Sequence, residues 1–405
     1  MDMELSRQRA STADPVEQAR WGGVLAMTMC VFALIASEFL PVSLLTPIAA
    51  DLHVTQGLAG QGITISAVFA VLTSLSISTL AGKLNRKTLL LGLTLLMSLS
   101  GLIVGLAPNY LVYMVGRALI GIVVGGFWSM SAATAIRLVP TDKVPKALAM
   151  FNSGNALATV VAAPLGSYLG AVIGWRGAFF CLVPIAILAF IWQALTLPAM
   201  HHEPHGRGSS PLGLLKRPQV VVGMLAVSVF FMGQFSLFTY LRPFLETVTH
   251  VVGAALSLTL LAMGVAGFFG TTLVGAIRKL GPHVTLVGIP LVMAAVAVAL
   301  IFTGASLVLV VPLLAFWAFL AMPAPVGWWA WLARTLPRDA EAGGGLMVAV
   351  VQLAIGLGSL AGGVIFDTSG WQGTFGFSAF VLVVASVLAY LTARMDISDR
   401  TSAQG

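Results

Sequence analysis

Residues 34–47 read Leu-Ile-Ala-Ser-Glu-Phe-Leu-Pro-Val-Ser-Leu-Leu-Thr-Pro and lie within the first long apolar run of the chain. Glu38 is the only one of the 14 acidic residues that falls inside a segment predicted to cross a membrane. A carboxylate at membrane depth is costly, so its default interpretation is functional, with a partner to be found. Pro41 and Pro47 are expected to kink or end this helix just above the acid.

The composition indicates an integral membrane protein. The 405 residues are 58% hydrophobic and 9% charged, whereas a soluble domain carries about 25% charged residues. Residues 1–20 are polar and charged, with no apolar region and no cleavage site of a signal peptide, so we expect the first span to be retained. Cys30 and Cys181 both lie in apolar runs, and no metal-ligand spacing occurs, so we expect neither a disulfide framework nor a metal site.

Apolar runs of ~20 residues predict twelve membrane-spanning helices in an all-α protein. Their ranges are 22–47, 58–81, 88–107, 110–136, 147–171, 177–197, 219–241, 253–277, 284–303, 306–331, 343–365 and 373–393. A polar stretch with His201, His202 and His205 separates six spans from six. We expect it to be a solvated linker rather than a metal site.

The lysines and arginines predict the orientation of the spans. With the N-terminus in the cytoplasm, all of the 21 lysines and arginines except Arg117, Arg176 and Arg242 lie on the cytoplasmic side. The net charge of +7 is therefore a topology signal, and we expect no nucleic-acid binding. The predicted units are a cytoplasmic tail 1–21, a six-helix half 22–197, a cytoplasmic linker 198–218, a second half 219–393 and a cytoplasmic tail 394–405.

An internal repeat supports this division. The pattern Arg-x-x-Pro-x-Asp at 137–142 recurs at 334–339, and Gly-Trp-x-Gly-x-Phe at 174–179 recurs at 370–375. Matching signals at nearly constant offsets of 197 and 196 residues indicate two parallel six-helix pseudo-repeat halves. Transporters built in this way place the substrate near the membrane midplane, between the halves.

Three motifs carry a resemblance to a known family. Residues 117–121 read Arg-Ala-Leu-Ile-Gly and resemble the Arg-x-x-x-Gly signature of proton-coupled members of the major facilitator superfamily. Residues 162–166, Ala-Ala-Pro-Leu-Gly, resemble the antiporter signature of that superfamily, and Gly-Trp-Arg at 174–176 is typical of its drug:proton antiporter-1 family. The resemblance covers essentially all the spans. It implies the major facilitator fold and transport driven by a proton gradient, with no cofactor.

Further stretches, 38–47, 125–132, 137–140 and 144–148, resemble the purine ribonucleoside efflux pumps of enteric bacteria. This resemblance implies export of nucleosides such as inosine and guanosine against inward proton flow. It also implies a multi-pass protein of the bacterial cytoplasmic (inner) membrane, with both termini in the cytoplasm.

Two positions depart from the family patterns. The loop at 82–87 has Asn85 where the family has Asp and is one residue short before it, so the charge interaction that latches this loop is weakened. Ala163 stands where many members have Gly.

Glu38 and Arg117 are predicted to lie at similar depth, about eight and seven residues below the outer ends of their spans, at ~1.5 Å per residue. They can pair if the two helices adjoin. The functional interpretation is a protonation switch, in which the acid alternates between a paired and a separated state and thereby couples proton uptake to conformational exchange. The alternative is a permanent ion pair that only fixes packing.

The span 110–136 carries further candidates on one face. Gly121 and Gly125 allow close approach of a neighbouring helix, and packing is the favoured interpretation. Trp128 lies in mid-span, where an indole can stack on a purine, and packing is the alternative. Ser131 is a candidate ligand, although serines in spans usually bond to their own helix.

Side-chain amides in the spans match the hydrogen-bonding groups of a nucleoside. The candidates are Asn152, Asn155, Gln234 and Gln352; the alternative is hydrogen bonding between helices. Trp328 is a candidate lining residue of the inner vestibule, whereas Trp329 and Trp331 favour an interfacial belt.

Bends are predicted at two more places. Gly154, Pro164 and Gly166 are expected to bend the span 147–171. Pro323 and Pro325 are expected to break the span 306–331.

The functional prediction is therefore a proton-coupled secondary exporter, with purine ribonucleosides as the substrate class that the resemblance implies. Sugars and hydrophobic drugs are the alternative substrates, and a non-transporting membrane sensor is a different class. No phosphate-binding loop or reactive constellation occurs, so we expect no enzyme. The expected partners are the nucleoside, protons and the lipid bilayer, and we expect a monomer.

Overall fold

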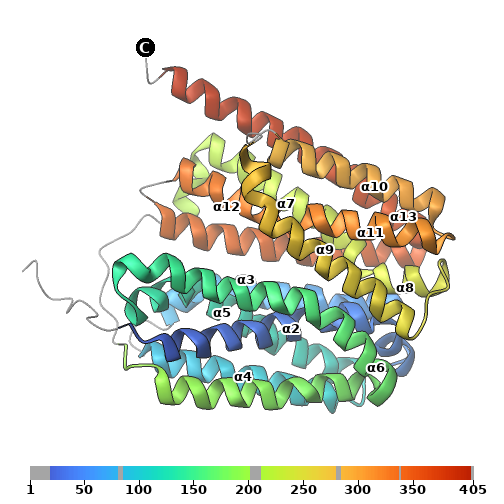
Figure 1. Cartoon of the computed structure of the whole chain (residues 1–405), viewed down its shortest axis with the longest axis horizontal. Helices are drawn as coiled ribbons and strands as arrows, with labels where there is room; N and C mark the ends of the chain where they lie inside the picture. The colour runs from blue at the N-terminus through green and yellow to red at the C-terminus, as the bar shows by residue number, and fades with distance from the viewer. Residues whose placement is uncertain (1–18, 81–84, 201–210, 280–283, 337–338, 403–405) are drawn as a thin grey trace, which may run out of the picture.

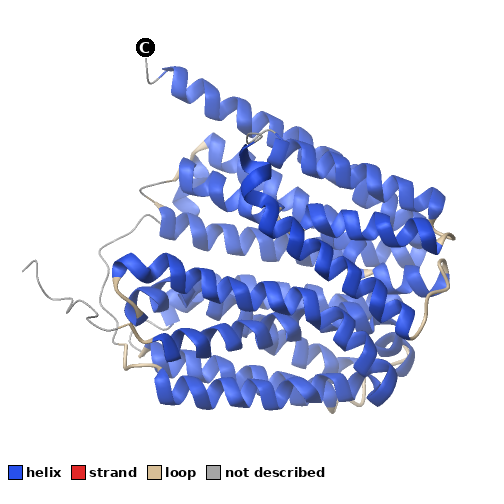
Figure 2. Cartoon of the chain, viewed as in Figure 1, coloured by secondary structure: helices blue, strands red, loops and turns tan. Residues whose placement is uncertain are grey.

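The computed structural model describes residues 19–80, 85–200, 211–279, 284–336 and 339–402. Two bundles of nearly parallel helices lie side by side along their length (Figure 1), and the described residues contain helices, turns and loops (Figure 2). We name the end near the described start of the chain the inner end, after the predicted orientation, and the opposite end the outer end. Residues 82–84 of the predicted loop and the histidines at 201, 202 and 205 lie outside the described ranges.

The first bundle contains the elements from α2 to α6. They are α2 Trp21–Asp51, α3 Gln56–Leu80, α4 Arg86–Gly105, α5 Tyr110–Leu138, η1 Thr141–Lys143 and α6 Val144–Thr196. The predicted spans 147–171 and 177–197 both lie in α6, which leaves helical geometry at Gly174. The first span is longer than predicted, because α2 passes through Pro41 and Pro47 and ends at Asp51.

The second bundle contains the elements from η2 to α13. They are η2 Pro211–Lys216, α7 Pro218–Thr239, α8 Leu241–Thr247, α9 Ala254–Lys279, the π-helical η3 Val284–Gly288, α10 Ile289–Thr303, α11 Leu307–Ala321, α12 Ala324–Thr335 and α13 Ala340–Ser402. The break at Pro323 separates α11 from α12, as predicted. α13 contains the last two spans, joined at Gly370, and continues to Ser402.

The backbone repeats the sequence duplication. Gly174 and Gly370, which are 196 residues apart, both have positive φ, 76° and 72°. His53 and His250, which are 197 residues apart, also share a positive φ, 55° and 57°. A left-handed backbone is rare for non-glycine residues, so its recurrence at equivalent loops indicates that the two halves turn in the same way.

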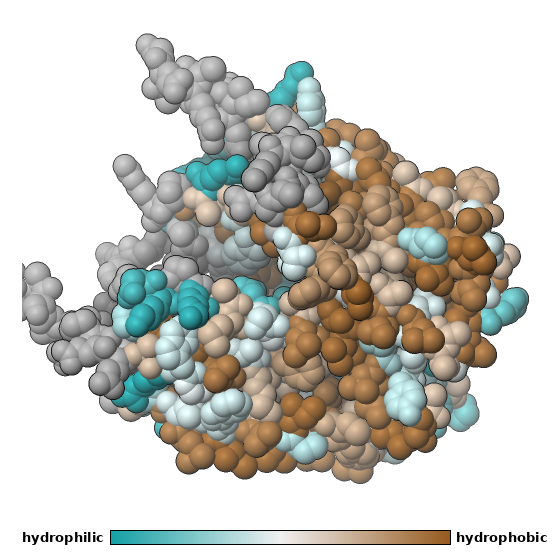
Figure 3. All heavy atoms as spheres, viewed as in Figure 1, coloured by the Kyte–Doolittle hydropathy of each residue, from teal (hydrophilic) through white to brown (hydrophobic). Residues whose placement is uncertain are grey.

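The exterior fits a membrane. Ten helical segments among the described residues are long and apolar enough to cross one. Two of them, Lys146–Thr196 with 51 residues and Ala342–Met395 with 54, divide at Gly174 and Gly370 and supply two crossings each, which confirms the predicted twelve. The face in Figure 3 is apolar over much of its middle, with hydrophilic residues gathered toward the inner end at its left.

Glycines allow the backbones within each bundle to come close together. A Cβ at Gly121 or Gly125 of α5 would collide with the carbonyl oxygens of Ser66 and Ala70 in α3, so this face packs as its spacing predicts. The bundles contact each other through α3 with α13, α6 with α9 and α2 with α8. The approach of α6 to α9 depends on Gly264, which faces the Val160 carbonyl.

That carbonyl has a special status. Pro164 lies four residues after Val160 and has no N–H, so it cannot supply the helical hydrogen bond that Val160 would otherwise accept. The same arrangement recurs in the second bundle, where Pro323 frees the Phe319 carbonyl and Gly270 of α9 packs against it. Close packing of a neighbouring backbone shields these carbonyls from lipid.

We predict that Gly264→Ala lowers the stability of the protein although alanine favours a helix. The added methyl group meets the Val160 backbone, and overpacking of this kind costs about 1–3 kcal/mol. The control is Gly376→Ala in α13, where a Cβ meets nothing within 4 Å. Thermal unfolding in detergent is the measurement, and equal midpoints for the two variants would contradict the prediction.

Candidate functional site

Glu38 lies in the middle of α2 and is 3% exposed. The helix continues past Glu38 through Pro41 and Pro47. Each proline leaves one carbonyl without its helical hydrogen bond, and each of these carbonyls has a donor from another helix. Pro41 frees the carbonyl of Ser37, and Pro47 frees that of Ser43, since each proline lies four residues further along the chain. Both carbonyls accept a hydrogen bond from an arginine.

Arg117 of α5 binds the first of these carbonyls. Its Nη1 donates to the Ser37 carbonyl at 2.8 Å, its Nη2 donates to the backbone carbonyl of Glu38 at 2.9 Å, and its Nε donates to the Gly62 carbonyl of α3 at 3.1 Å. The side chain is completely buried. Arg117 therefore holds α2, α3 and α5 together where Pro41 interrupts the hydrogen bonding of α2.

The predicted ion pair between Glu38 and Arg117 is absent from this conformation. The depth prediction was correct, because Arg117 reaches the Glu38 backbone, but each of its three nitrogens donates to a carbonyl rather than to the carboxylate. The ion pairs among the described residues lie elsewhere. The freed Ser37 carbonyl competes for the guanidinium, and a rigid planar fork that serves three backbone oxygens has no further donor directed at the carboxylate.

The Glu38 carboxylate instead contacts the other bundle. Gln352 of α13 donates from Nε2 to Glu38 Oε1 at 3.3 Å, and Gln352 is 7% exposed. One turn further along α13, the Gly356 carbonyl accepts a hydrogen bond from Thr64 Oγ1 of α3 at 3.1 Å. The acid thus lies at the seam between the two bundles, and an amide of the second bundle is its hydrogen-bond partner.

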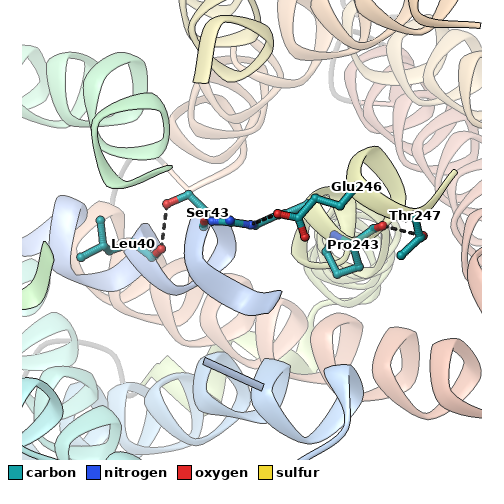
Figure 4. A network of polar contacts seen from close by, with 6 residues as sticks. Leu40, Ser43, Pro243, Glu246 and Thr247 are labelled. Carbon is teal, nitrogen blue, oxygen red and sulfur yellow. Dashed lines mark hydrogen bonds and ion pairs between the residues drawn. The ribbon is translucent and has the colours of Figure 1, made fainter. Parts of the chain in front are cut away.

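Arg242 of α8 binds the second freed carbonyl, across the same seam. Its Nη1 donates to the carbonyl of Ser43, and its Nε donates to Glu246 Oε1 at 2.8 Å. Figure 4 shows Leu40 and Ser43 on α2 opposite the α8 residues. The side chains of Arg242 and Glu246 are only 11% and 16% exposed. This ion pair is mostly buried, and Arg242 also joins α8 to α2 of the other bundle.

Further contacts join the bundles near the outer end. Thr55 Oγ1 donates to Asp367 Oδ2 at 2.6 Å, and the N–H of Gly57 donates to Asp367 Oδ1 at 3.0 Å. Within the second bundle, the hydroxyl of Tyr240 donates to the Ser359 carbonyl at 2.8 Å and packs beside Gly60 of α3. The bundles are therefore bonded at mid-depth and at the outer end.

The inner end contains exposed polar side chains on both bundles. Asn152 and Ser153 of α6 and Arg334 of α12 are exposed. The Nδ2 of Asn152 donates to the Leu148 carbonyl of its own helix at 3.1 Å, and Asn155 is half-buried.

An aromatic row lies next to Glu38. Phe39 of α2 stacks on Phe235 of α7 with ring centroids 5.6 Å apart. Phe238 of α7 stacks on Trp317 of α11 at 6.5 Å, and Phe235 meets Phe238 edge-on at 5.8 Å. Within this row Phe235 and Trp317 are buried in the core, and Phe39 and Phe238 are half-buried.

Gln234 of α7 is 5% exposed, and its Oε1 has no hydrogen-bond donor in the described structure. Gln234 lies 196 residues after Glu38, so the repeat places it at the equivalent position of the second half. A buried acceptor without a donor costs ~1–3 kcal/mol, so it is a ready site for a donor group of a solute.

The candidates in α5 mostly satisfy their own helix. Ser131 Oγ donates to the Trp128 carbonyl at 3.0 Å, and Ser129 Oγ donates to the Gly125 carbonyl at 2.7 Å. Trp128 is half-buried and meets Phe127 edge-on at 6.1 Å. Its indole remains partly accessible, whereas the hydroxyls are engaged.

The tryptophans of α12 differ from the predicted belt. Trp329 is 45% exposed, as a belt residue would be, but Trp331 is 1% exposed and packs on Gly223 of α7. Trp328 is 2% exposed and meets Trp331 edge-on at 5.9 Å, so it belongs to the core in this conformation and does not line an open vestibule. The glycine in α7 provides the space that draws Trp331 inward.

Sequence reasoning missed Arg242, Asp367 and Phe235. Proline four residues after Ser43 was a signal that this carbonyl needs a donor, but nothing in the sequence identifies the donor. Asp367 lies two residues beyond the predicted span 343–365, and an acid at the end of a span is common, so it gave no signal. Phe235 was one of 22 phenylalanines, and only its contact with Phe39 distinguishes it.

Comparisons with known proteins agree with this architecture. A sequence profile of the Major Facilitator Superfamily matches residues 27–347. The chain is 37% identical over 383 residues to the purine ribonucleoside efflux pump NepI of Shigella sonnei, covering 95% of this chain and 97% of that protein. It is 62% identical over 385 residues to the transcription regulatory protein OpdE of Pseudomonas aeruginosa, covering 94% and 96%.

Solved structures share the fold. A bacterial homologue of the human lysosomal transporter Spinster, in an inward-facing and unoccupied conformation, has a TM-score of 0.76 at 17% identity and covers 95% of this chain and 98% of that chain. The human organic anion transporter MFSD10 has a TM-score of 0.66 at 15% identity, covering 91% and 99%. Likeness at this identity concerns the fold alone.

We predict that Arg117→Leu destabilises the protein and that Pro41→Ala partly restores it. Removing the guanidinium leaves the buried Ser37 carbonyl without a donor, at ~1–3 kcal/mol, whereas the Glu38 and Gly62 carbonyls lie inside helices and lose only a second hydrogen bond. Replacing the proline by alanine returns an N–H to the Ser37 carbonyl, so that carbonyl is no longer left unsatisfied when Arg117 is removed. The measurement is a double-mutant cycle by unfolding in detergent, and strictly additive effects of the two substitutions would contradict it.

We also predict that Arg242→Gln opens the outer end. One hydrogen bond to a charged group is worth ~1.5–3 kcal/mol, so the population with separated outer ends should rise about tenfold or more. Spin labels on cysteines at Pro108 and Ala305, both exposed outer-end residues on different bundles, report the distance by electron paramagnetic resonance.

The control for this experiment is Arg176→Gln. Arg176 also lies at the outer end, but it contacts Asp51 and the Ala107 carbonyl, so its partners stay inside the first bundle. Equal distance distributions in the Arg242 variant and this control would show that Arg242 does not hold the bundles together.

Proposed function

The chain belongs to the major facilitator superfamily, and we propose that it is a proton-coupled antiporter that exports purine ribonucleosides such as inosine and guanosine. The observation that carries the proposal is the position of Glu38. A titratable carboxylate, 3% exposed in the interior of a membrane-spanning helix, bonds to the opposite bundle through Gln352. A group so placed changes the contact between the bundles when it gains or loses a proton, which is what coupling requires.

Arg117 supports this role from the same helix bend. It stays bound to backbone carbonyls, so it supplies a fixed positive charge near Glu38 and is not itself consumed by an ion pair. A fixed charge beside a titratable one lets the acid change state without leaving a buried arginine unpartnered. Glu38 is thus the group that exchanges the proton, and Arg117 is the group that holds the helix around it.

The surroundings suit an uncharged, partly aromatic solute. The half-buried Phe39 and Phe238 supply aromatic rings beside Glu38, and the free Oε1 of Gln234 accepts from an N–H or O–H. Purine rings stack on aromatic side chains, and ribose hydroxyls donate to amide oxygens. The 37% identity to NepI, which is named as a purine ribonucleoside efflux pump, supports the same substrate class over sugars or hydrophobic drugs.

The remaining parts of the proposal follow the charge distribution and the family. We place the protein in the bacterial inner membrane with both termini in the cytoplasm, as a monomer that works without a cofactor and does not bind nucleic acid. The substrate enters from the inner end, where Asn152, Asn155 and the half-buried Trp128 lie on the first bundle.

A second candidate is a membrane sensor that retains the fold and signals without transport. The observation that favours it is the name of OpdE, a transcription regulatory protein, at 62% identity. The two candidates differ in a measurable property, because a sensor binds its solute without moving it across the bilayer.

We predict that reconstituted wild-type protein uses a pH gradient across the vesicle membrane to accumulate inosine, and that Glu38→Gln abolishes this accumulation. Glutamine has the same shape as glutamate but cannot take up or release a proton, so the variant should still exchange inosine for inosine at equal pH. Flux of radiolabelled inosine is the measurement. Solute binding without flux in the wild type would favour the sensor, and normal accumulation by Glu38→Gln would refute the assignment of the proton site.

A further inference from the structure

Gln352 is bonded to Glu38 through only one side of its amide. Nε2 donates to the Glu38 carboxylate at 3.3 Å, whereas Oε1 is buried and has no donor in the described structure. The two residues come from different bundles, and both are buried. A free acceptor therefore lies on the same amide that contacts the titratable acid.

The chemistry of the pair allows two hydrogen-bonded states. An ionised carboxylate accepts only, so it takes a hydrogen from the amide nitrogen. A protonated carboxyl gains an O–H, which can donate to the amide oxygen after the amide turns over. The first bond is charge-assisted and roughly twice as strong as the neutral one. The bond between the bundles therefore weakens when Glu38 takes up a proton, although it need not disappear.

The other groups around Glu38 do not provide this change. Arg117 is occupied by three carbonyls, and Tyr113 lies one turn from it on α5. Arg242 and Glu246 on α8 bond to each other and to the Ser43 carbonyl. α3 carries no titratable residue. On α6 and α13, the charged residues Arg176 and Asp367 lie beside the breaks at Gly174 and Gly370, where they bond to outer-end groups and not to Glu38.

Packing fixes the position of Gln352. Gly356, one turn along α13, contacts Ala67 of α3 and accepts from Thr64, so α13 cannot move from α3 without breaking these contacts. A change in the Glu38–Gln352 hydrogen bond therefore acts on the interface where α2, α3 and α13 meet. Small differences at such a packed interface select between discrete arrangements of the bundles.

We propose that Gln352 is the positioning residue that transmits the proton occupancy of Glu38 to the second bundle. The ionised acid holds α13 through the amide nitrogen and favours the arrangement with joined outer ends described here. The protonated acid releases the charge-assisted bond and favours separation. This role rests on the proposed proton coupling at Glu38 and extends it by naming the residue that converts protonation into movement.

The first test uses no substrate. Spin labels on cysteines at Ser153 and Ala333, exposed inner-end residues on different bundles, report the distance between the bundles as the pH is changed, with Cys30 and Cys181 replaced by alanine. We expect the ratio of the two populations to change with pH in this background. In Gln352→Leu we expect that change to shrink about tenfold, the size of one hydrogen bond to a charged group.

A matched control and an exchange of the pair make the test specific. Gln193→Leu removes another fully buried glutamine, whose Oε1 accepts from Thr94 within the first bundle, and should leave the pH response intact. The combined variant Glu38→Gln with Gln352→Glu restores an acid–amide pair with the partners exchanged. It should recover the pH-dependent distances that each single variant lacks. Such recovery would show that the loss in the single variants is not a folding defect.

The outcomes separate this inference from the proposed function. Loss of the pH response in Glu38→Gln with a normal response in Gln352→Leu overturns the role of Gln352 alone. A normal response in Glu38→Gln overturns proton coupling at Glu38 and the role of Gln352 with it. Absence of inosine flux in the wild type contradicts the substrate proposal and leaves the distance measurement valid. If the exchanged pair, Glu38→Gln with Gln352→Glu, shows no larger pH response than Glu38→Gln alone, the role of Gln352 is also overturned.

Discussion

Backbone carbonyls that prolines leave without an N–H donor constrain much of this structure. In lipid such a carbonyl cannot bond to water, so it must accept from another protein donor or be covered by close packing. Arg117 supplies the donor for Ser37, and Arg242 supplies it for Ser43. Gly264 and Gly270 bring neighbouring backbones against the carbonyls freed by Pro164 and Pro323. The prolines of α2, α6 and the α11–α12 segment are thus accompanied by specific partners for the carbonyls that they free.

The two arginine contacts differ in what they join. Arg117 binds within the first bundle and can persist while the bundles move. Arg242 crosses from the second bundle to α2, so it must release if the outer end opens. Between these two positions lies Glu38, bonded across the seam through Gln352. The helix α2 therefore contacts Arg117 of α5, Gln352 of α13 and Arg242 of α8 within a short stretch from Ser37 to Ser43.

The fold was largely predictable because it depends on signals that are local in sequence. Hydrophobic runs gave the twelve crossings, and the repeat at 174–179 and 370–375 gave the duplication that the positive φ angles of Gly174 and Gly370 display. The depth of Glu38 and Arg117 followed from counting residues along two helices. The ion pair between them did not follow, because the competing acceptor on Ser37 exists only in a helix that Pro41 bends rather than ends.

The sequence by itself determined the membrane class, the crossings, the halves and the presence of one costly acid, since each depends on composition or periodicity along the chain. The tertiary structure decided which groups meet. Gln352 lies 314 residues from Glu38, and Arg242 lies 199 residues from Ser43, so no local pattern records either contact. Partners at such separations are selected by the packing of whole bundles, where a freed carbonyl or a buried carboxylate takes whichever donor the opposite helix brings within reach.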